Sequence, residues 1–512
     1  MGQEIELKLE LPRAVIGKAL TLPWLRELSS APAKHETLTS VYFDTPKFKL
    51  RDRGVALRVR HIGKKRLQTI KAIQKGGRGA FGRDEWEKEI AGATPDLALA
   101  KGTALAPLVT KNLRRKLRPV FETVIERATL PVHSGGSDIE VAVDRGYIKA
   151  GRKREPVSEI ELELKGGGDR TELAQIAERL ARSLPVAYGA RPKQDRGYAL
   201  VAEAATGAVG AADIVFDPNL STAEAFQVIS LSCLDHALGN ERSVRAGDTE
   251  GVHQMRVGLR RLRAALSLFK PVIDGPEAEA IKTELKWLTE QLGPARDFDV
   301  LVAEGIRPLC DTAPAAETRL LSRDLGGKRD KGFDQAKAAV ESDRCRSLGL
   351  RTALWIINGD WLRRRDEMAT ALRDRPAAEF AAEILGQRLK KILKKAARIE
   401  CLEPHRRHKL RIAVKKLRYA TEFFSSLFGG DKYGKSFTKR LKALQDALGR
   451  LNDIEVHKHV AQAIVHRECS RRRADKALAI GFVTGHEQTE LEPCLTAVAK
   501  SAKRLGRAAG DG

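Results

Sequence analysis

The segment Gln3-Glu4-Ile5-Glu6-Leu7-Lys8-Leu9, close to the start of the chain, alternates charged with aliphatic residues. Successive side chains of a β-strand point to opposite faces of the sheet, so Glu4, Glu6 and Lys8 share one face and the aliphatic side chains share the other. An ordinary strand with its charges in solvent explains one such segment equally well. The same pattern recurs as far as Lys165, and this recurrence favours a functional interpretation.

Period-two alternation predicts strands near residues 3–11, 37–44, 55–62, 66–73, 82–91, 120–132, 138–149 and 157–165. Short helices are expected near 105–117 and 170–183. Several of the strands carry charges of both signs on one face. If the strands close into a barrel, the charged face could line its interior, with the aliphatic face packed against covering helices. Carboxylates bind hard divalent cations, and Arg and Lys bind the phosphates that such metals bridge.

This ordered series resembles the CYTH superfamily, the triphosphate tunnel metalloenzymes, over nearly all of residues 1–202. Glu4-x-Glu6-x-Lys8 is similar to the ExExK signature of that family, which is a weak pattern alone. The later matching segments are Tyr42-Phe43-Asp44-Thr45, Arg58-x-Arg60, Thr69-x-Lys71, Arg83-x-Glu85-x-Glu87, Arg127, Asp144, Glu159-x-Glu161 and Lys193. The resemblance implies an eight-stranded antiparallel β-barrel tunnel with covering helices, which binds a triphosphate with Mg²⁺ or Mn²⁺.

The resemblance also implies a role for each matching residue. The metal would be bound by Glu4, Glu6, Asp144, Glu159 and Glu161, with assistance from Glu85 and Glu87. The catalytic set would comprise Glu4, Glu6, Lys8, Glu159 and Glu161. Phosphate oxygens would be bound by Lys8, Arg58, Arg60, Lys71, Arg83, Arg127 and Lys193. Glu163 extends the alternation by one step and could equally be a structural residue at the tunnel mouth.

The hydrophobic period changes to 3.6 from about residue 220 onward, which predicts an all-α domain. We expect a linker over residues 203–218 and the helical domain over 219–507. The segment from His253 to Arg263 aligns without gaps on the segment from His408 to Arg418, and Leu285–Val300 aligns on Leu441–Val456. A nearly constant offset across two motifs indicates a helical bundle built from two duplicated halves.

The first helix of each half separates an apolar stripe from a basic face. One stripe comprises Met255, Leu259, Leu262, Leu266 and Phe269, and its counterpart Leu410, Val414, Leu417, Thr421 and Phe424. A basic helix face is usually just solvated. Two such faces related by pseudosymmetry would instead form a cationic cleft if they faced each other, and an anion between them would relieve the repulsion of like charges.

This repeat resembles the CHAD domain from about residue 220 to 505. The resemblance implies a module that binds long-chain inorganic polyphosphate without chemistry of its own. The implied binding residues are His253, Arg256, Arg260, Arg263, His408, Arg411, Lys415, Lys416 and Arg418, with Lys286 and Lys442 as supporting candidates. Arg261 turns away from the central row. Asp297, Asp299, Asn452 and Asp453 follow Gly293 and Gly449, and we expect them to be helix N-caps.

Composition narrows the class of partner. The 512 residues carry a formal net charge of +25, which calls for an anionic partner, whereas only 5% are aromatic. Few aromatic residues and the absence of a DNA-binding motif argue against nucleic acid. The six cysteines are widely spaced, and no apolar run is long enough to cross a membrane. We therefore expect a cytoplasmic protein, which could associate with polyphosphate granules, and no membrane partner.

The preferred function is metal-dependent hydrolysis of inorganic triphosphate to diphosphate and phosphate, with inorganic polyphosphate bound by the helical domain. One alternative is a non-catalytic protein that binds or targets polyphosphate. Another is a tunnel enzyme acting on an organic triphosphate, either thiamine triphosphate or, in a cyclase, ATP. The sequence leaves open the preferred metal, the length of the polyphosphate chain, the coupling between domains and the oligomeric state.

Overall fold

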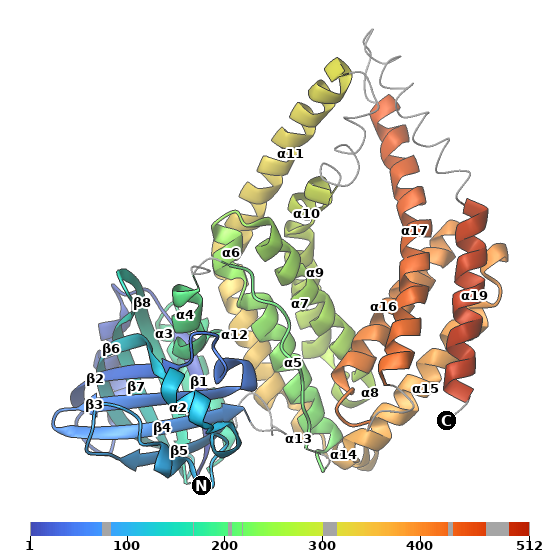
Figure 1. Ribbon diagram of the computed structural model, residues 1–512. Coiled ribbons are helices and arrows are strands. Elements are labelled where there is room, and N and C mark those ends of the chain that lie inside the picture. Colours follow the sequence, from blue (N-terminus) through green and yellow to red (C-terminus); the bar gives the residue numbers. More distant parts are fainter. Residues whose placement is uncertain are drawn as a thin grey trace.

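The computed structural model describes residues 2–73, 83–166, 168–202, 207–217, 219–300, 315–428, 434–466 and 491–510. An antiparallel sheet domain comes first and an all-helical domain follows (Figure 1). The predicted α+β class with two domains is therefore confirmed.

The described part of the sheet domain contains nine strands. They are β1 (Gly2–Glu10), β2 (Lys34–Asp44), β3 (Val55–Ile62), β4 (Lys65–Ile73), β5 (Arg83–Glu89), β6 (Arg118–Ser134), β7 (Ser137–Ala150), β8 (Lys153–Lys165) and β9 (Ala187–Tyr188). Their order in the sheet is β5-β4-β3-β2-β6-β7-β8-β1-β9. Eight of them coincide with the predicted strands, and the two-residue β9 had no recognisable alternation because it is too short to show one.

The expected eight-stranded barrel needs correction in its closure. β1 pairs with β8 from Ile5 to Glu10, and only its first three residues, Gly2 to Glu4, pair with β5. The sheet thus curls round until its edge strand β5 meets β1, but this junction is short. The result is a curled nine-stranded sheet with a partly closed interior.

The aliphatic face of the sheet packs outward against α3 (Arg170–Ser183), as expected from the alternation. Leu7 and Leu9 of β1 share one buried core with Leu173 and Ile176 of α3. The predicted helix near 105–117 is divided instead into a single turn at Ala106–Leu108 and α2 (Lys111–Lys116). Thr110 separates them because it adopts an extended conformation and caps α2 through its side chain.

The described part of the helical domain contains long helices joined by several short ones. They are α5 (Thr222–Leu238), α6 (Glu241–Arg245), α7 (Thr249–Leu268), α8 (Lys270–Ile273), α9 (Pro276–Gln291), α10 (Gly293–Val300), α11 (Ala315–Glu341), α12 (Asp343–Asn358), α13 (Asp360–Arg363), α14 (Glu367–Asp374), α15 (Ala377–Ala396), α16 (Pro404–Phe423), α17 (Lys435–His466) and α19 (Leu491–Gly510). The two duplicated basic segments lie on α7 and α16, which contact each other. Both apolar stripes are buried, as predicted.

The second repeated motif differs between the halves. In the first half it spans α9 and α10, and in the second half it lies within the single helix α17. Asp297 and Asp299 are inside α10, while Asn452 and Asp453 are inside α17, so the N-cap interpretation of these four residues is wrong. The glycines before them do not end a helix: Gly293 begins α10, and Gly449 continues α17.

The two domains share a continuous apolar core. The segment 207–217, inside the expected linker, has no helix or strand but buries Ile214 and Phe216. Phe216 packs on Phe424 with ring centroids 6.2 Å apart. Between the domains, Tyr188 donates a hydrogen bond to Asp235 at 2.8 Å. The linker region is therefore partly packed against the helical domain.

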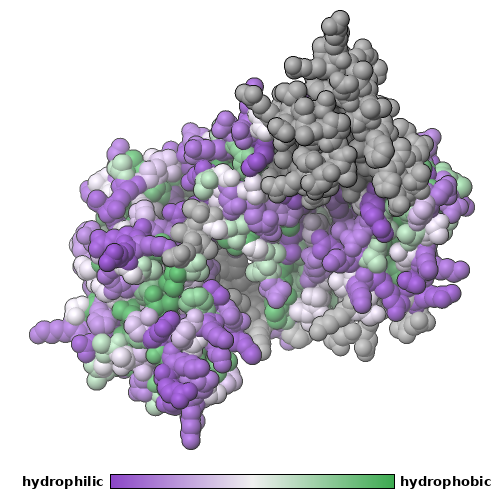
Figure 2. All heavy atoms as spheres, turned by 45° about the horizontal axis from the view of Figure 1, so that its top comes forward, coloured by the Kyte–Doolittle hydropathy of each residue, from purple (hydrophilic) through white to green (hydrophobic). Residues whose placement is uncertain are grey.

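The outer surface is mostly polar on the face shown in Figure 2, where hydrophilic side chains lie along much of the rim. This agrees with the high charge of the chain. Among the described residues, no helix is long and apolar enough to cross a membrane.

Candidate functional site

The curled sheet encloses a cavity of about 520 Å³ whose lining is strongly charged. Its cations are Lys8, Arg58, Arg60, Lys71, Arg127, Lys165 and Lys193, and its carboxylates are Glu6, Glu85, Glu87, Glu140, Asp144, Glu161 and Glu163. The strand faces that carry these charges therefore point inward. A lining of this kind suits an anion together with a cation.

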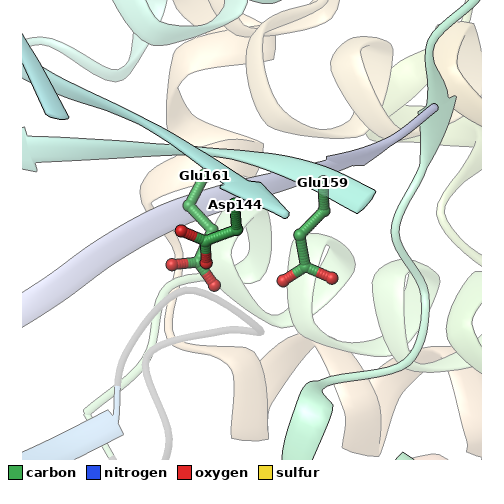
Figure 3. A group of neighbouring side chains, drawn as sticks. All are labelled: Asp144, Glu159 and Glu161. Atoms are coloured by element: carbon green, nitrogen blue, oxygen red, sulfur yellow. The ribbon is translucent and has the colours of Figure 1, made fainter. Parts of the chain in front are cut away.

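Three carboxylates form an acidic centre, and two of them, Asp144 and Glu161, line the cavity. Asp144 of β7 lies opposite Glu159 of β8 in the strand register, and Glu161 follows two residues later on the same face. An oxygen from each lies within 4.8 Å of the others, and the three groups point to one side of the sheet (Figure 3). Asp144 and Glu159 are almost fully buried. Such a set matches the oxygen ligands that divalent cations prefer.

Lys193 reaches this acidic centre from α4 (Lys193–Val201), which begins directly after Pro192. Its Nζ donates to Asp144 Oδ2 at 2.7 Å and to Glu161 Oε1 at 3.0 Å, and it also contacts Glu159. The resemblance implied phosphate binding by Lys193. The structure places its ammonium among the carboxylates, where it neutralises part of their charge.

Two further cations bind the same carboxylates. Arg127 donates from Nε and Nη2 to the two oxygens of Asp144, both at 2.7 Å, and its Nη2 also contacts Glu161. Lys8 lies 2.7 Å from Glu161 and 2.8 Å from Glu6. Lys8 therefore forms ion pairs both with Glu6 and with the acidic centre. Bidentate and charge-assisted bonds of this kind fix side-chain geometry closely.

The opposite side of the cavity is predominantly basic. Arg58 and Lys71 share Glu85, at 3.5 Å and 3.2 Å respectively. Arg60 donates to Ser40 Oγ at 3.3 Å. Burial, together with the neighbouring Arg58 and Arg127, lowers the pKa of Arg60 to about 10. A cation under such repulsion favours the arrival of an anion.

Burial and charge act against each other in the acidic centre. Burial alone would raise the pKa of Asp144 and Glu161, but Lys193 and the other cations hold both pKa values below their ordinary range. For Glu159 the effect of burial prevails and the pKa is raised. Burial would lower the pKa of Lys193, yet Glu159 and Glu161 raise it. The centre therefore holds two ionised carboxylates next to one that accepts a proton more readily.

Two predicted residues cannot be placed in the cavity. Glu4 and Arg83 pair across β1 and β5 in the strand register, but their side chains lie outside the described residues. Of the two assisting carboxylates, Glu85 pairs with Arg58 and Lys71, while Glu87 accepts a hydrogen bond from Thr69 at 2.9 Å.

Sequence reasoning missed Glu155 and Arg196. Arg196 is buried on α4, and its Nε donates to Glu155 Oε1 at 2.6 Å while its Nη1 lies 3.3 Å from Glu159 Oε2. A signal was present, since Arg196 follows Lys193 by about one helical turn and Glu155 precedes Glu159 by two strand periods. These residues lie behind the acidic centre rather than on its open side.

The basic face of the helical domain is also partly assembled. Arg256 of α7 donates to the carbonyl of Thr289 at 3.0 Å and lies 3.6 Å from Asp297. Burial and the charge of Arg296 on α10 lower the pKa of His253. Arg296 is therefore a further member of this basic group that the repeat alignment did not reveal, because the corresponding position of the second half is Asn452.

The two halves meet through charged residues at the α7–α16 contact. Glu422 of α16 binds Arg418 at 2.5 Å and Arg261 of α7 at 3.3 Å. Arg261 is buried there and shares Glu422 with Arg418. Burial, then Arg388 and Arg263, lowers the pKa of Lys416. Arg263 and Lys416 thus approach one another across the repeat.

The remaining predicted residues of this face are more exposed. His408 and Lys442 are exposed, Arg411 and Lys415 are half-buried, and Lys286 forms an exposed pair with Glu290 at 3.6 Å. The described contacts bring parts of the two basic rows together, and they do not show the two histidines facing each other.

A second cavity, of about 750 Å³, lies between α3, α9 and α12. Its lining mixes apolar side chains such as Leu184 and Leu350 with charges of both signs. This mixture does not indicate one class of ligand. The smaller cavity inside the curled sheet, called the tunnel below, is therefore the candidate site.

The fold and the site together define a class of protein: a curled antiparallel sheet around a cavity lined by carboxylates and cations, followed by a duplicated helical domain with a basic face. Residues 2–198 match the CYTH domain and residues 229–462 match the CHAD domain. The chain therefore contains a CYTH domain followed by a CHAD domain.

The relatives include one protein with a named activity. An inorganic triphosphatase of Haemophilus influenzae is 32% identical over 206 residues, which is 39% of this chain and 55% of that protein. This chain therefore matches only about half the length of that relative. An uncharacterised protein of Mycobacterium tuberculosis is 25% identical over 503 residues, 92% of this chain and 90% of its own. The crystal structure of a CHAD domain from Ricinus communis is 32% identical, with a TM-score of 0.49, and covers 58% of this chain and 96% of its own.

Proposed function

We propose that the tunnel hydrolyses inorganic triphosphate to diphosphate and phosphate with the help of Mg²⁺ or Mn²⁺. The observation that carries this proposal is a cluster of three carboxylates, of which Asp144 and Glu161 line the cavity, together with a separate group of cations in the same cavity. The similarity of the sheet domain to an inorganic triphosphatase supports the same reaction.

The cations would bind the phosphate chain. Arg58, Arg60 and Lys71 stand on the basic side of the cavity, and Lys8 and Arg127 connect that side to the carboxylates. Phosphoryl transfer depends mainly on position and on charge neutralisation, because the transition state spreads charge over the phosphoryl oxygens. These side chains would orient the terminal phosphate and stabilise the diphosphate that leaves.

The carboxylates fit a divalent cation, since hard oxygen donors from three side chains converge within 4.8 Å. Asp144, Glu159 and Glu161 would hold the metal, and Glu6 and Glu4 are the additional candidates on β1. When bound, the metal would neutralise phosphate charge and lower the pKa of water. Attack of water on the terminal phosphorus would break its bond to the bridging oxygen, with diphosphate as the leaving group and the proton of the water released to solvent.

An inorganic substrate is favoured over an organic one by the aromatic content of the cavity. Among the described lining residues, Tyr42 is the only aromatic side chain. Its ring already stacks on Phe121 with centroids 4.4 Å apart, and its hydroxyl lies 3.5 Å from Arg58. It therefore offers little surface on which a nucleobase or thiamine ring could stack.

For the helical domain we propose binding of inorganic polyphosphate along the basic faces of α7 and α16. Within the described part of the chain, the buried Nε atoms of Arg256 and Arg260 have no hydrogen-bond acceptor. Buried donors of this kind are costly unless they are satisfied, and phosphate oxygens would satisfy them.

Hydrolysis should depend on the carboxylates of the tunnel. Glu161→Gln and Glu159→Gln should each lower the turnover of tripolyphosphate by about 100-fold or more, because even indirect partners of a metal typically contribute ~10–100-fold. Turnover is measured by phosphate release with Mg²⁺ and with Mn²⁺, against long-chain polyphosphate, ATP and thiamine triphosphate. Purified protein that hydrolyses none of these would contradict the proposal, and faster turnover of an organic substrate would reassign it.

Polyphosphate binding should depend on the helical faces instead. The double variant Arg256→Glu with Arg411→Glu reverses one charge in each half and should weaken binding of long-chain polyphosphate by about 100-fold. Its hydrolysis of tripolyphosphate should remain normal, which makes it the matched control for Glu161→Gln. Binding that survives the charge reversal would exclude this surface. Displacement of bound polyphosphate by RNA at equal phosphate concentration would point to nucleic acid.

A further inference from the structure

We propose that Arg242 of the helical domain is a positioning residue for the metal site of the sheet domain and acts through Glu155 and Arg196 on Glu159. This inference rests on the proposed function of the tunnel, because it assigns a helical-domain residue to the same site. It adds a physical link by which one domain determines the geometry of the other.

The link consists of consecutive ion pairs. Arg242 lies on α6 and contacts Glu155 of β8 across the domain boundary. The same oxygen of Glu155 accepts a hydrogen bond from Nε of Arg196 at 2.6 Å. Arg196 then reaches Glu159 Oε2 with its Nη1, at 3.3 Å. Two intervening side chains therefore separate the helical domain from a carboxylate of the acidic centre.

Most of this chain of contacts is buried. The side chains of Glu159, Glu155 and Arg196 are 1%, 6% and 7% exposed, whereas Arg242 is 40% exposed. Buried charges need partners in close geometry, since an uncompensated buried charge costs several kcal/mol. Arg196 also donates to the carbonyl of Pro156 at 2.6 Å, so its guanidinium is held in one plane. It can therefore transmit a change at Glu155 to Glu159.

The carboxylate of Glu159 depends on this contact for its orientation. Its Oε1 faces Lys193 and the metal-binding side, while its Oε2 faces Arg196. The group that holds Oε2 thus determines how Oε1 is presented. Partners behind a ligand of this kind typically contribute ~10–100-fold to metal affinity.

The position of Arg242 is fixed by the helical domain and not by the sheet. α6 packs against α7 so closely that a Cβ on Gly251 would lie 2.3 Å from the Cβ of Ser243. The backbone amide of Asp248 also donates to the carbonyl of Ser243 at 2.9 Å. Arg242 therefore moves with α7, the helix that carries the basic row from His253 to Arg263.

A simpler interpretation is that the Arg242–Glu155 pair only joins the two domains. The interface offers controls for this case, because other contacts cross it without reaching the acidic centre. Thr171 of α3 donates to Asn358 of α12 at 3.0 Å, and Tyr188 donates to Asp235 of α5 at 2.8 Å. Thr171→Val and Tyr188→Phe remove such contacts and leave the ion pairs intact.

Removal of Arg242 should weaken metal binding through a shift of Arg196. Without Arg242, Glu155 keeps its hydrogen bond from Arg196, with the charge of Arg191 also nearby, and we expect it to draw the Arg196 guanidinium away from Glu159. We expect Arg242→Ala to weaken Mn²⁺ binding by about 10-fold. Arg242→Lys keeps the charge and should restore part of the affinity. Glu155→Gln should weaken binding to a similar degree, and the double variant should lose no more than either single variant.

The test is calorimetric titration of Mn²⁺ into the full-length protein without substrate. The wild type is compared with Arg242→Ala, Arg242→Lys, Glu155→Gln and the double variant of Arg242→Ala with Glu155→Gln. The two interface controls are titrated in the same way. Thermal unfolding of each protein shows whether it folds. Weaker binding in Arg242→Ala and Glu155→Gln, with partial recovery in Arg242→Lys and normal binding in Thr171→Val and Tyr188→Phe, is the expected result.

Two other outcomes would separate a failure of this inference from a failure of the proposed function. Normal Mn²⁺ binding in folded Arg242→Ala and Glu155→Gln, or an equal loss in the interface controls, would overturn this inference and leave the proposed function intact. Failure of the wild type itself to bind Mn²⁺ would contradict the metal-dependent function, and this inference with it.

Discussion

Glu159 lies in the acidic centre with each of its two carboxylate oxygens facing a different cation. Alternation along β8 placed it on the charged face together with Glu161, and both do reach the acidic centre. Its two partners, Lys193 and Arg196, come from a helix and lie 34 and 37 residues later in the chain. Their geometry depends on how that helix packs on the sheet, and no local pattern contains this information. The shared face of Glu159 and Glu161 was therefore predictable, and the contacts that support Glu159 were not.

At the same scale, His253 should make polyphosphate binding depend on pH. Burial and the nearby Arg296, Arg260 and Arg256 lower its pKa, although Glu250 acts in the opposite direction, so His253 is neutral at pH 7. A bound polyanion favours the protonated form, so affinity should rise as the pH falls. Between pH 8 and pH 5 we expect a gain of about 3- to 10-fold, which corresponds to a shift of up to one pKa unit.

The measurement is binding of long-chain polyphosphate at constant ionic strength across this pH range, because the internal phosphates of such a chain remain ionised throughout. His253→Gln should reduce the pH dependence. An identical pH profile in the wild type and in His253→Gln would remove His253 from the binding surface.

Among the elements, α4 positions more of the site than its nine residues suggest. It carries both Lys193 and Arg196, and it approaches the sheet at Gly197. A Cβ at Gly197 would lie 2.2 Å from the ring of Phe121, which is itself stacked on Tyr42. The close approach of α4 therefore requires glycine at this position.

Gly197→Ala should both destabilise the protein and weaken its metal site. Phe121 is 4% exposed and has little room to move, so overpacking should cost about 1–3 kcal/mol. The displaced helix would carry Lys193 and Arg196 away from the carboxylates, and Mn²⁺ binding should weaken. Thermal unfolding and calorimetry measure the two effects.

Gly449→Ala in α17 is the matched control. A Cβ there meets no atom within 4 Å, and alanine is the better helix former by up to about 1 kcal/mol. This variant should therefore be as stable as the wild type or more so. A Gly197→Ala protein with unchanged stability and unchanged Mn²⁺ binding would show that α4 tolerates displacement.

Helices and strands with a long hydrophobic repeat were predicted from the sequence, and shorter ones were not. The eight long strands and the duplicated helices show clear periods and were predicted. The two-residue β9 is too short to show one, and the segment 105–117 is divided at Thr110 by a side-chain cap. The division between α9 and α10 was missed as well, because the same motif continues as one helix in the second half.

For the whole molecule, the net charge of +25 serves two differently built surfaces. In the tunnel, cations alternate with carboxylates and are mostly paired with them. On α7 and α16, basic residues gather with fewer acidic partners, although Asp297 and Glu422 are among these. The first arrangement suits a short phosphate chain with a metal, and the second suits a longer anion without one. The ion pairs from Arg242 to Glu159 connect the two domains.

If Asp144, Glu159 and Glu161 hold a catalytic metal, the protein should split tripolyphosphate only in the presence of Mg²⁺ or Mn²⁺. Phosphorus NMR of tripolyphosphate with the full-length protein and either metal follows this reaction. The predicted result is one diphosphate and one phosphate for each triphosphate consumed, with no turnover after chelation of the metal and at least about 100-fold less in Glu161→Gln. Intact tripolyphosphate with the wild-type protein and either metal, or equal turnover in Glu161→Gln, would contradict metal-dependent hydrolysis at this site.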